Sequence, residues 1–268
     1  MDAVVTGLYA PPRVNSLLDT LPIEVIGPLL FVALCLVAEI SGQLRRRSNA
    51  GEAGHAAAAS VSLLALMISF TFSVALNRYD NRRDLVVEEA AAISMVWQRG
   101  RLLDNPARGT VETTLRAYVD DRLDYFQRDR QTDRTRPPDA AGRRLRLALW
   151  LVVDTLNDAK AEPIVTRALI DALTRLDDAA ARRESMAREH IPLLVIDLLV
   201  LFSLIIAAIL GHAGAANGRA ARLANWAFLV SVTLALMLVL DLDRPRTGLV
   251  TVSQLPMLQL GTIMDAAP

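Results

Sequence analysis

The sequence predicts an all-α integral membrane protein with four transmembrane helices in two hairpins and a helical aqueous domain inserted between spans 2 and 3. Two observations support this class. Four apolar runs each have about the 20 residues that a helix needs to cross a bilayer, and the two pairs of runs flank a long charged middle. The runs occupy residues 23–44, 56–76, 191–211 and 224–240. The third run has a single charge in 21 residues, whereas one face of a soluble helix normally meets water and is polar.

The apolar runs divide the 268 residues into four parts. We expect an N-terminal segment and transmembrane hairpin at 1–76, a helical extramembrane domain at 77–190, a second hairpin at 191–240 and a C-terminal tail at 241–268. The middle part has room for one domain of about 110 residues. No cleavable signal peptide is expected, because the N-terminal residues lack a basic region and the first apolar run is long enough to remain as a span.

The composition excludes some classes of partner. The chain has 29 basic and 29 acidic residues and a formal net charge of zero. A nucleic-acid-binding protein usually has a basic surplus on one face, so no nucleic-acid partner is expected. Cys35 is the only cysteine, which rules out an intrachain disulfide. The Ala- and Arg-rich, Lys-poor composition indicates a bacterial chain.

The second span is expected to continue into the aqueous domain as one long helix. No Pro or Gly interrupts residues 56–99. With a rise of 1.5 Å per residue, this helix is roughly 65 Å long, about twice the thickness of the hydrocarbon core. Its aqueous part has Leu85, Ala92, Met95 and Val96 on one side, and this spacing predicts a buried stripe.

The rest of the middle domain is expected to be a small helical bundle. Pro106 lies in a break at 104–109 and predicts the end of the long helix. Pro163 is placed to start another helix. Amphipathic helices are expected at 110–128, 145–156 and 164–176, with a polar, proline-containing linker at 131–142.

Arginines near the span ends predict the orientation. Arg45, Arg46 and Arg47 follow the first span, and Arg219 and Arg222 lie between the third and fourth. Short loops rich in Lys and Arg face the cytoplasm. We therefore expect a multi-pass protein of the bacterial inner membrane with cytoplasmic hairpin loops. Domain 77–190 and both termini would then be extracytoplasmic.

Three segments resemble the bacterial bestrophin-like family, a catalogued domain of unknown function. They are FTFSVALNRYDNRRDLVVEEAAAI (70–93), LDLDRPRTGLVTVSQLPML (240–258) and, more weakly, YVDDRLD (118–124). With the two-plus-two layout of spans, the resemblance covers nearly the whole chain. It implies a homo-oligomeric ion channel whose second helices line the pore. In true bestrophins the aqueous domain is cytosolic, which differs from the orientation that the loop charges predict here.

A polar face of the second span is the candidate pore lining. Six residues recur at three- and four-residue spacing and so share one helix face: Ser62, Leu66, Ser69, Phe70, Ser73 and Asn77. In a symmetric ring of such helices, this face would surround a pore with a constriction at Phe70 or Leu66. Small and hydroxyl residues also pack helices together in membranes, so helix packing is the alternative interpretation.

Charged residues near the span ends form a second candidate site. Asp197 lies about 9 Å inside the third span, where a carboxylate costs a few kcal/mol unless it is paired, protonated or hydrated. The residues expected on the same side are Arg78, Arg82, Asp241, Asp243, Arg244 and Arg246. The favoured role is a buried ion-pair network that fastens the span ends to the aqueous domain, and the alternative is an ion site. The charged run 78–89 is expected to contact another subunit or the turn after the fourth span, or to be a solvated face.

The sequence predicts no enzyme, no cofactor and no metal site. It contains no hydrolase, phosphate-binding or metal-ligating motif. Asp120, Asp121 and Asp124 are interleaved with Arg116 and Arg122, a pattern typical of surface ion pairs. The predicted function is a bestrophin-like oligomeric ion channel or pore in a lipid bilayer, with inorganic ions as its ligands. The alternative is a non-conducting sensor or scaffold whose extracytoplasmic helical domain binds a partner.

Overall fold

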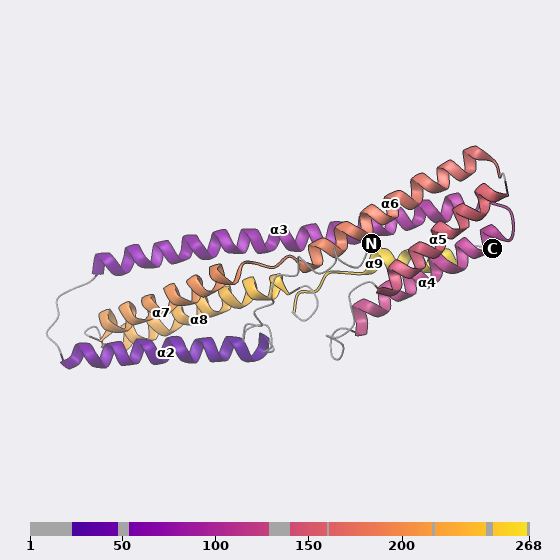
Figure 1. Cartoon of the computed structure of the whole chain (residues 1–268). Coiled ribbons are helices and arrows are strands. Elements are labelled where there is room, and N and C mark those ends of the chain that lie inside the picture. Colours follow the sequence, from indigo (N-terminus) through magenta and orange to yellow (C-terminus); the bar gives the residue numbers. More distant parts are fainter. Residues whose placement is uncertain are drawn as a thin grey trace, which may run out of the picture. The chain divides into compact units, whose positions relative to one another are not determined.

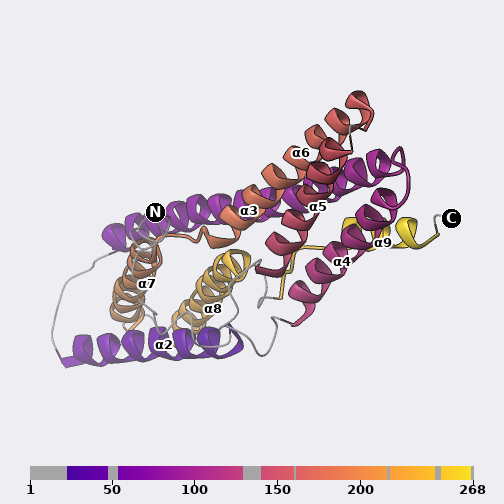
Figure 2. The ribbon, with the colours of Figure 1, turned by 45° about the vertical axis from the view of Figure 1, so that its right-hand side comes forward.

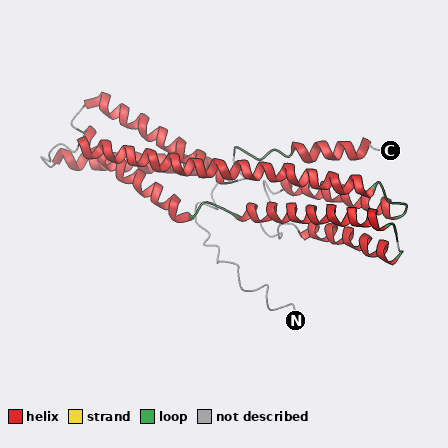
Figure 3. Cartoon of the chain, turned by 90° about the horizontal axis from the view of Figure 1, so that it is seen from above, coloured by secondary structure: helices red, strands yellow, loops and turns green. Residues whose placement is uncertain are grey.

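Helices make up all the regular secondary structure that the computed structural model describes (Figure 3). The described residues are 23–47, 54–128, 140–159, 161–215, 218–244 and 249–266. Their helices, labelled in Figure 1, are α2 (Ile23–Arg47), α3 (Gly54–Gly100), α4 (Ala107–Arg128), α5 (Ala140–Asp158), α6 (Pro163–Arg188), α7 (Leu193–Gly214), α8 (Gly218–Asp243) and α9 (Leu255–Ala266). The predicted all-α class is confirmed. Most of the predicted linker at 131–142 lies outside the described residues.

The chain divides into two compact units. The membrane unit comprises Met1–Phe70 and Leu193–Leu240, and the aqueous unit comprises Thr71–Pro192 and Asp241–Pro268. Helix α3 contributes its first part to the membrane unit and its second part to the aqueous unit. The segment predicted as a C-terminal tail therefore belongs to the aqueous unit.

Four described helices are long and apolar enough to cross a membrane. They comprise Glu24–Arg45, Ala57–Gly100, Leu193–Gly214 and Arg219–Asp243, and each overlaps one of the predicted spans. Only 17% to 33% of their most apolar windows is buried within the chain. Since such a surface is unfavourable in water, most of it must face lipid or another copy of the chain.

The membrane unit packs α2 closely against α7. Leu34 of α2 and Ala207 of α7 are fully buried in one apolar cluster, and Gly211 lies one helical turn after Ala207. A Cβ atom added to Gly211 would lie 2.0 Å from the carbonyl oxygen of Ala38. Small residues at such a crossing allow two membrane helices to bring their backbones together. Glycine at position 211 is therefore required by the contact with α2.

The aqueous unit is built around the second part of α3. Ile93 of α3, Leu115 of α4, Leu149 of α5, Leu176 of α6 and Met257 of α9 are all fully buried in one apolar cluster. Figure 2 shows α6 alongside this part of α3, and ion pairs between the two helices, described below, confirm the contact. One core therefore joins the four consecutive helices α3 to α6 with α9, which follows the fourth span.

The buried stripe of α3 differs slightly from the predicted one. Ala92 and Val96 are buried as expected, but Leu85 and Met95 are only half-buried. Ile93 and Trp97 also fill the core, and Met95 packs against it. The prediction is confirmed for Ala92 and Val96 but omitted Ile93 and Trp97, because several apolar residues in succession leave the rotation of a helix poorly defined by its spacing alone.

The later helices are longer than predicted. Helix α5 begins at Ala140, before the predicted start, and α6 continues to Arg188, far beyond the predicted end. The added part of α6 is strongly charged and carries little apolar pattern. It is stabilised by ion pairs with α3 and α5, and Ala179 and Ala180 are buried on its inner side. Pro163 is at the start of α6, as predicted. Helix α9 was not predicted.

We expect Gly211→Ala to disrupt the membrane unit. The new methyl group would overlap the backbone of Ala38, which has no flexible end that can move away. Overpacking of this kind costs about 1–3 kcal/mol or more, so the melting temperature of the purified protein should fall by several degrees. Gly261→Ala in α9 is the matched control, because its Cβ would meet Val119 at an ordinary 3.7 Å. Equal melting temperatures for the two variants would contradict the close contact.

Candidate functional site

The six residues of the candidate pore lining all lie on the exposed side of α3. Phe70 is 72% exposed and Leu66 is 67% exposed, and the side chains of Ser62, Ser69, Ser73 and Asn77 are exposed as well. On the other side of the helix, Leu64 and Ala75 are buried. The predicted face is thus free of contacts that would bury it within its own chain. Its role as a pore lining stays a prediction.

Two hydroxyl groups on this face are already hydrogen-bonded within the helix. Ser62 donates to the carbonyl oxygen of Ala58 at 3.0 Å, and Ser69 donates to that of Ala65 at 2.8 Å. A serine that bonds to the preceding turn satisfies its donor without a second helix. The oxygen lone pairs remain accessible, so this face can accept hydrogen bonds from water.

Arg82 is the best-anchored member of the predicted charged network. Its side chain is buried, and its guanidinium donates to the carbonyl oxygens of Leu242 at 3.1 Å and Glu189 at 2.9 Å. Leu242 lies in the last turn of α8, where unpaired carbonyl groups carry partial negative charge. The guanidinium therefore caps α8 and fastens the chain after α6 to α3.

Two carboxylates of the network bind backbone amides. Asp241 accepts hydrogen bonds from the N–H groups of Leu249 and Val250 at 2.6 and 2.8 Å. Asp243 accepts from the N–H of Ile191 at 3.0 Å. Carboxylates held by backbone donors stabilise the local chain path. Through these backbone groups, Asp243 holds the segment that precedes the third span, and Asp241 holds the segment that follows the fourth.

The remaining predicted members of the network are Arg78, Arg244, Arg246 and Asp197. Arg78 is half-buried on α3 and Arg244 follows α8, while Arg246 lies outside the described residues. Asp197 belongs to the membrane unit and is exposed on α7. Within the described part of that unit, Asp197 has no hydrogen bond or ion pair. Its two predicted roles, in an ion-pair network or as an ion site, stay predictions.

A second charged cluster surrounds Glu89 in the aqueous unit. The Glu89 side chain is fully buried on α3, and its carboxylate accepts hydrogen bonds from Tyr118 at 2.5 Å and Arg122 at 2.8 Å, both on α4. Arg183 of α6 pairs with its other oxygen and also donates to the side-chain oxygen of Gln254 at 2.9 Å. One carboxylate therefore holds together α3, α4, α6 and the segment before α9.

The protonation states follow from this arrangement. Burial alone would raise the pKa of Glu89, but the charges of Arg183 and Arg122 hold that pKa below its ordinary value. Burial and then the charge of Glu89 raise the pKa of Tyr118 well above its usual range. The carboxylate is therefore ionised and the tyrosine protonated at neutral pH, as their hydrogen bond requires.

Comparison with known proteins identifies the family. A family model described as a bestrophin-like domain matches residues 27–257. The chain belongs to the bestrophin-like family. No curated protein matches.

Solved structures agree with the bestrophin-like fold. A crystal structure of a bacterial bestrophin homologue from Klebsiella pneumoniae has 17% sequence identity and a TM-score of 0.68, over 90% of this chain and 96% of the homologue. A tyrosine-to-alanine variant of a bacterial bestrophin homologue from the same organism has 17% sequence identity and a TM-score of 0.67, over 90% of this chain and 96% of that one. A third crystal structure, described as a membrane protein, has 16% identity and a TM-score of 0.69, over 90% of this chain and 95% of that one.

The three segments that resemble the bestrophin-like family meet in the aqueous unit. Arg82 and Glu89 come from the first segment and Tyr118 from the weaker third, while Leu242 and Gln254 come from the one after the fourth span. The prediction that the charged run contacts the turn after the fourth span holds for Arg82. Asp80, Arg83 and Asp84 are exposed on the single chain, and for them both a contact with another subunit and a solvated face stay predictions.

The cluster around Glu89 was not predicted from the sequence. The expectation of surface ion pairs for the Asp/Arg-rich stretch of α4 is wrong for Arg122, because that side chain is buried. A signal was present: Tyr118 and Arg122 share the apolar stripe of α4 with Val111 and Leu115. A charged residue on a buried stripe needs a buried partner of opposite charge, and Glu89 supplies it.

We expect Glu89→Gln to destabilise the aqueous unit by about 3–5 kcal/mol at pH 7, since it leaves the buried guanidinium of Arg122 and the half-buried one of Arg183 without their carboxylate. Because the pKa of Glu89 is lowered in the folded protein, its contribution is present above the unfolded pKa, about 4.5, and is lost as the pH falls through the folded value. The difference in melting temperature between wild type and variant should therefore narrow as the pH falls below about 5.

The neighbouring residue provides a matched control for this prediction. Glu88 pairs with Arg182 at 2.9 Å, but these side chains are 42% and 60% exposed. Exposed pairs contribute about 0–1 kcal/mol, so Glu88→Gln should change the melting temperature little at any pH. A loss of stability as large in Glu88→Gln as in Glu89→Gln would contradict the special role of the buried carboxylate.

Proposed function

We propose that this bestrophin-like protein is a homo-oligomeric ion channel of the bacterial inner membrane and that α3 lines its pore. The observation that carries the proposal is the exposed face of α3, on which serines alternate with Leu66 and Phe70 at helical spacing. Several copies around an axis would bring these faces together. Membership of the bestrophin-like family also supports a channel, because bestrophins are ion channels.

The composition of this face fits a pore better than a lipid contact. Four of the six residues are polar, and their exposed oxygen atoms can accept hydrogen bonds from water in a pore, which lipid cannot donate. Leu66 and Phe70 add two large apolar side chains on the same face. Rings of such residues narrow a pore and make water unstable in it, so that conduction is gated by dewetting. We assign the main constriction to Phe70, the more exposed of the two.

Asp197 supports the proposal of an oligomer. A charged group that faces hydrocarbon costs several kcal/mol, and such groups in spans usually face a bundle interior or water. Asp197 is exposed on the single chain. We therefore place it against a neighbouring subunit or a water-filled space, where either of its predicted roles can be fulfilled.

A non-conducting sensor or scaffold is the alternative function. It would use the same fold, with the exposed face of α3 packed against other helices and the aqueous unit binding a partner. The alternative is distinguished from the channel by ion flux through reconstituted liposomes.

We expect Phe70→Ala to raise ion flux on the order of tenfold, equivalent to a barrier lower by about 1.4 kcal/mol, because it removes the apolar ring. The measurement is flux through liposomes containing the purified protein. Phe72→Ala is the control, since Phe72 is about 200° around the helix and is half-buried. Equal flux through both variants, or no flux through the wild type and either variant, would favour the sensor or scaffold.

We propose the orientation that the loop charges predict, with both hairpin loops in the cytoplasm. In a variant without Cys35, cysteines at Asn49 and Ala216 should be protected from an impermeant thiol reagent in intact cells. A cysteine at Thr135 should be labelled. These three positions lie outside the described residues. The reversed labelling pattern would assign the cytosolic orientation of true bestrophins to the aqueous unit.

A further inference from the structure

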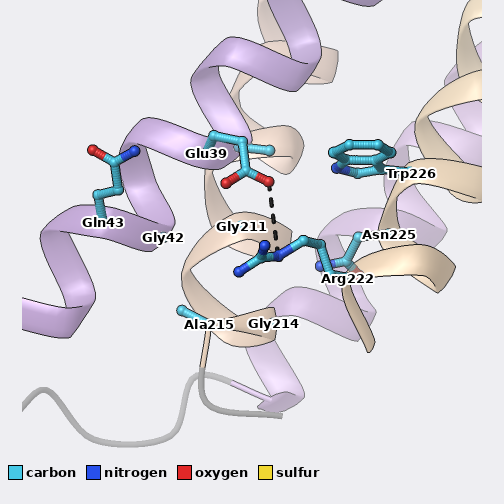
Figure 4. A pocket seen from close by; sticks show the side chains of 10 residues that line it. Glu39, Gly42, Gln43, Gly211, Gly214, Ala215, Arg222, Asn225 and Trp226 are labelled. Carbon is cyan, nitrogen blue, oxygen red and sulfur yellow. Dashed lines mark ion pairs between the residues drawn. The ribbon is translucent and has the colours of Figure 1, made fainter. Parts of the chain in front are cut away.

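A small polar cavity lies at the end of the membrane unit where α2 and α7 end and α8 begins. It has a volume of about 110 Å³. One wall is formed by residues with little or no side chain, including Gly42 and Gly211, because the backbones of α2 and α7 approach closely there. The polar wall carries Glu39, Arg222 and Asn225 (Figure 4). The cavity can therefore hold a group of several heavy atoms beside one acid and one base.

The charges of this cavity balance each other. Glu39 and Arg222 point toward one another in Figure 4, and their nearest oxygen and nitrogen atoms are 3.9 Å apart. This distance is too long for a direct hydrogen bond, and the side chains are 40% and 47% exposed. Arg45 is nearby in the unit but donates to the carbonyl oxygens of His212 and Ala213. The cavity thus presents one negative and one positive group that are only loosely bound to each other.

An apolar surface continues from the cavity along α8. Trp226 lines the cavity, and Val230 and Leu234 follow it at four-residue spacing, so all three share one side of the helix. Each of them is exposed on the chain. Tryptophan near the end of a span typically lies at the boundary between headgroups and hydrocarbon. The cavity therefore lies at headgroup level, and the apolar strip runs from it into the bilayer.

We propose that this cavity binds the headgroup of an aminophospholipid. Arg222 binds the phosphodiester and Glu39 binds the ammonium group, while the acyl chains lie along Trp226, Val230 and Leu234. The balance of charge argues for a zwitterionic headgroup, since the Glu39 carboxylate repels the headgroup of an anionic lipid. The apolar strip argues for a complete lipid, since a soluble phosphoester would leave that strip uncovered.

The test measures lipid binding to the purified, delipidated protein in detergent. Binding is read from the shift in the protein's melting temperature as each lipid is titrated. We expect dioleoylphosphatidylethanolamine to bind about tenfold more tightly than dioleoylphosphatidylglycerol, the difference that about 1.4 kcal/mol provides. Glu39→Gln should abolish this preference while phosphatidylglycerol still binds. Arg222→Gln should weaken the binding of both lipids. The assay does not depend on ion conduction, so its outcome is separate from that of the channel proposal.

Controls separate the proposed site from a structural ion pair and from a soluble ligand. Glu88→Gln and Arg182→Gln alter an exposed ion pair of the aqueous unit and should leave lipid preference unchanged. Glycerophosphoethanolamine, which has no acyl chains, should bind at least tenfold more weakly than the complete lipid. Equal affinity of the wild type for both lipids would overturn the proposal, as would an unchanged preference in Glu39→Gln. Equal binding of the soluble headgroup would assign the site to a free phosphoester instead.

Discussion

The aqueous unit depends on the buried carboxylate of Glu89. This group accepts hydrogen bonds from Tyr118 and Arg122 and pairs with Arg183. A buried charge is strongly unfavourable without partners, and several simultaneous partners reverse that penalty only when their geometry is good. Because the partners come from α4 and α6, the carboxylate can be satisfied only when these helices are assembled around α3. The cluster therefore favours one arrangement of the bundle over others that bury the same apolar surface.

Helix α3 belongs to both units. The same uninterrupted helix carries Glu89 in the aqueous unit and Ser62, Leu66, Ser69 and Phe70 of the exposed face in the membrane unit. Arg82 adds a contact to the last turn of α8. Arg82 and Glu89 therefore anchor the second part of α3 within the aqueous unit, while the first part belongs to the membrane unit. In the proposed channel, the exposed face around Phe70 would meet the same face of neighbouring subunits.

The spans and the long helix were predictable from the sequence because they depend on local properties. Apolar length identified α2, α7 and α8, and the absence of Pro and Gly predicted the continuation of α3. The pairing of Glu89 with Arg183 was not predictable, since it joins residues on helices that sequence spacing cannot align. Helix α9 and the charged end of α6 were missed for the same reason: tertiary contacts stabilise them where their own patterns are weak. The cavity at Glu39 and Arg222 likewise depends on how closely α2 and α7 approach.

The most direct test of the proposed α3-lined pore is a structure of the assembled protein in lipid nanodiscs, determined by electron cryomicroscopy. The proposed pore predicts a closed ring of chains in which the α3 helices surround the axis, with Phe70 at the narrowest point and the serines of the same face directed into the lumen. A ring whose axis is lined by α2 or α8, or a single chain whose α3 face is covered by lipid, would contradict it.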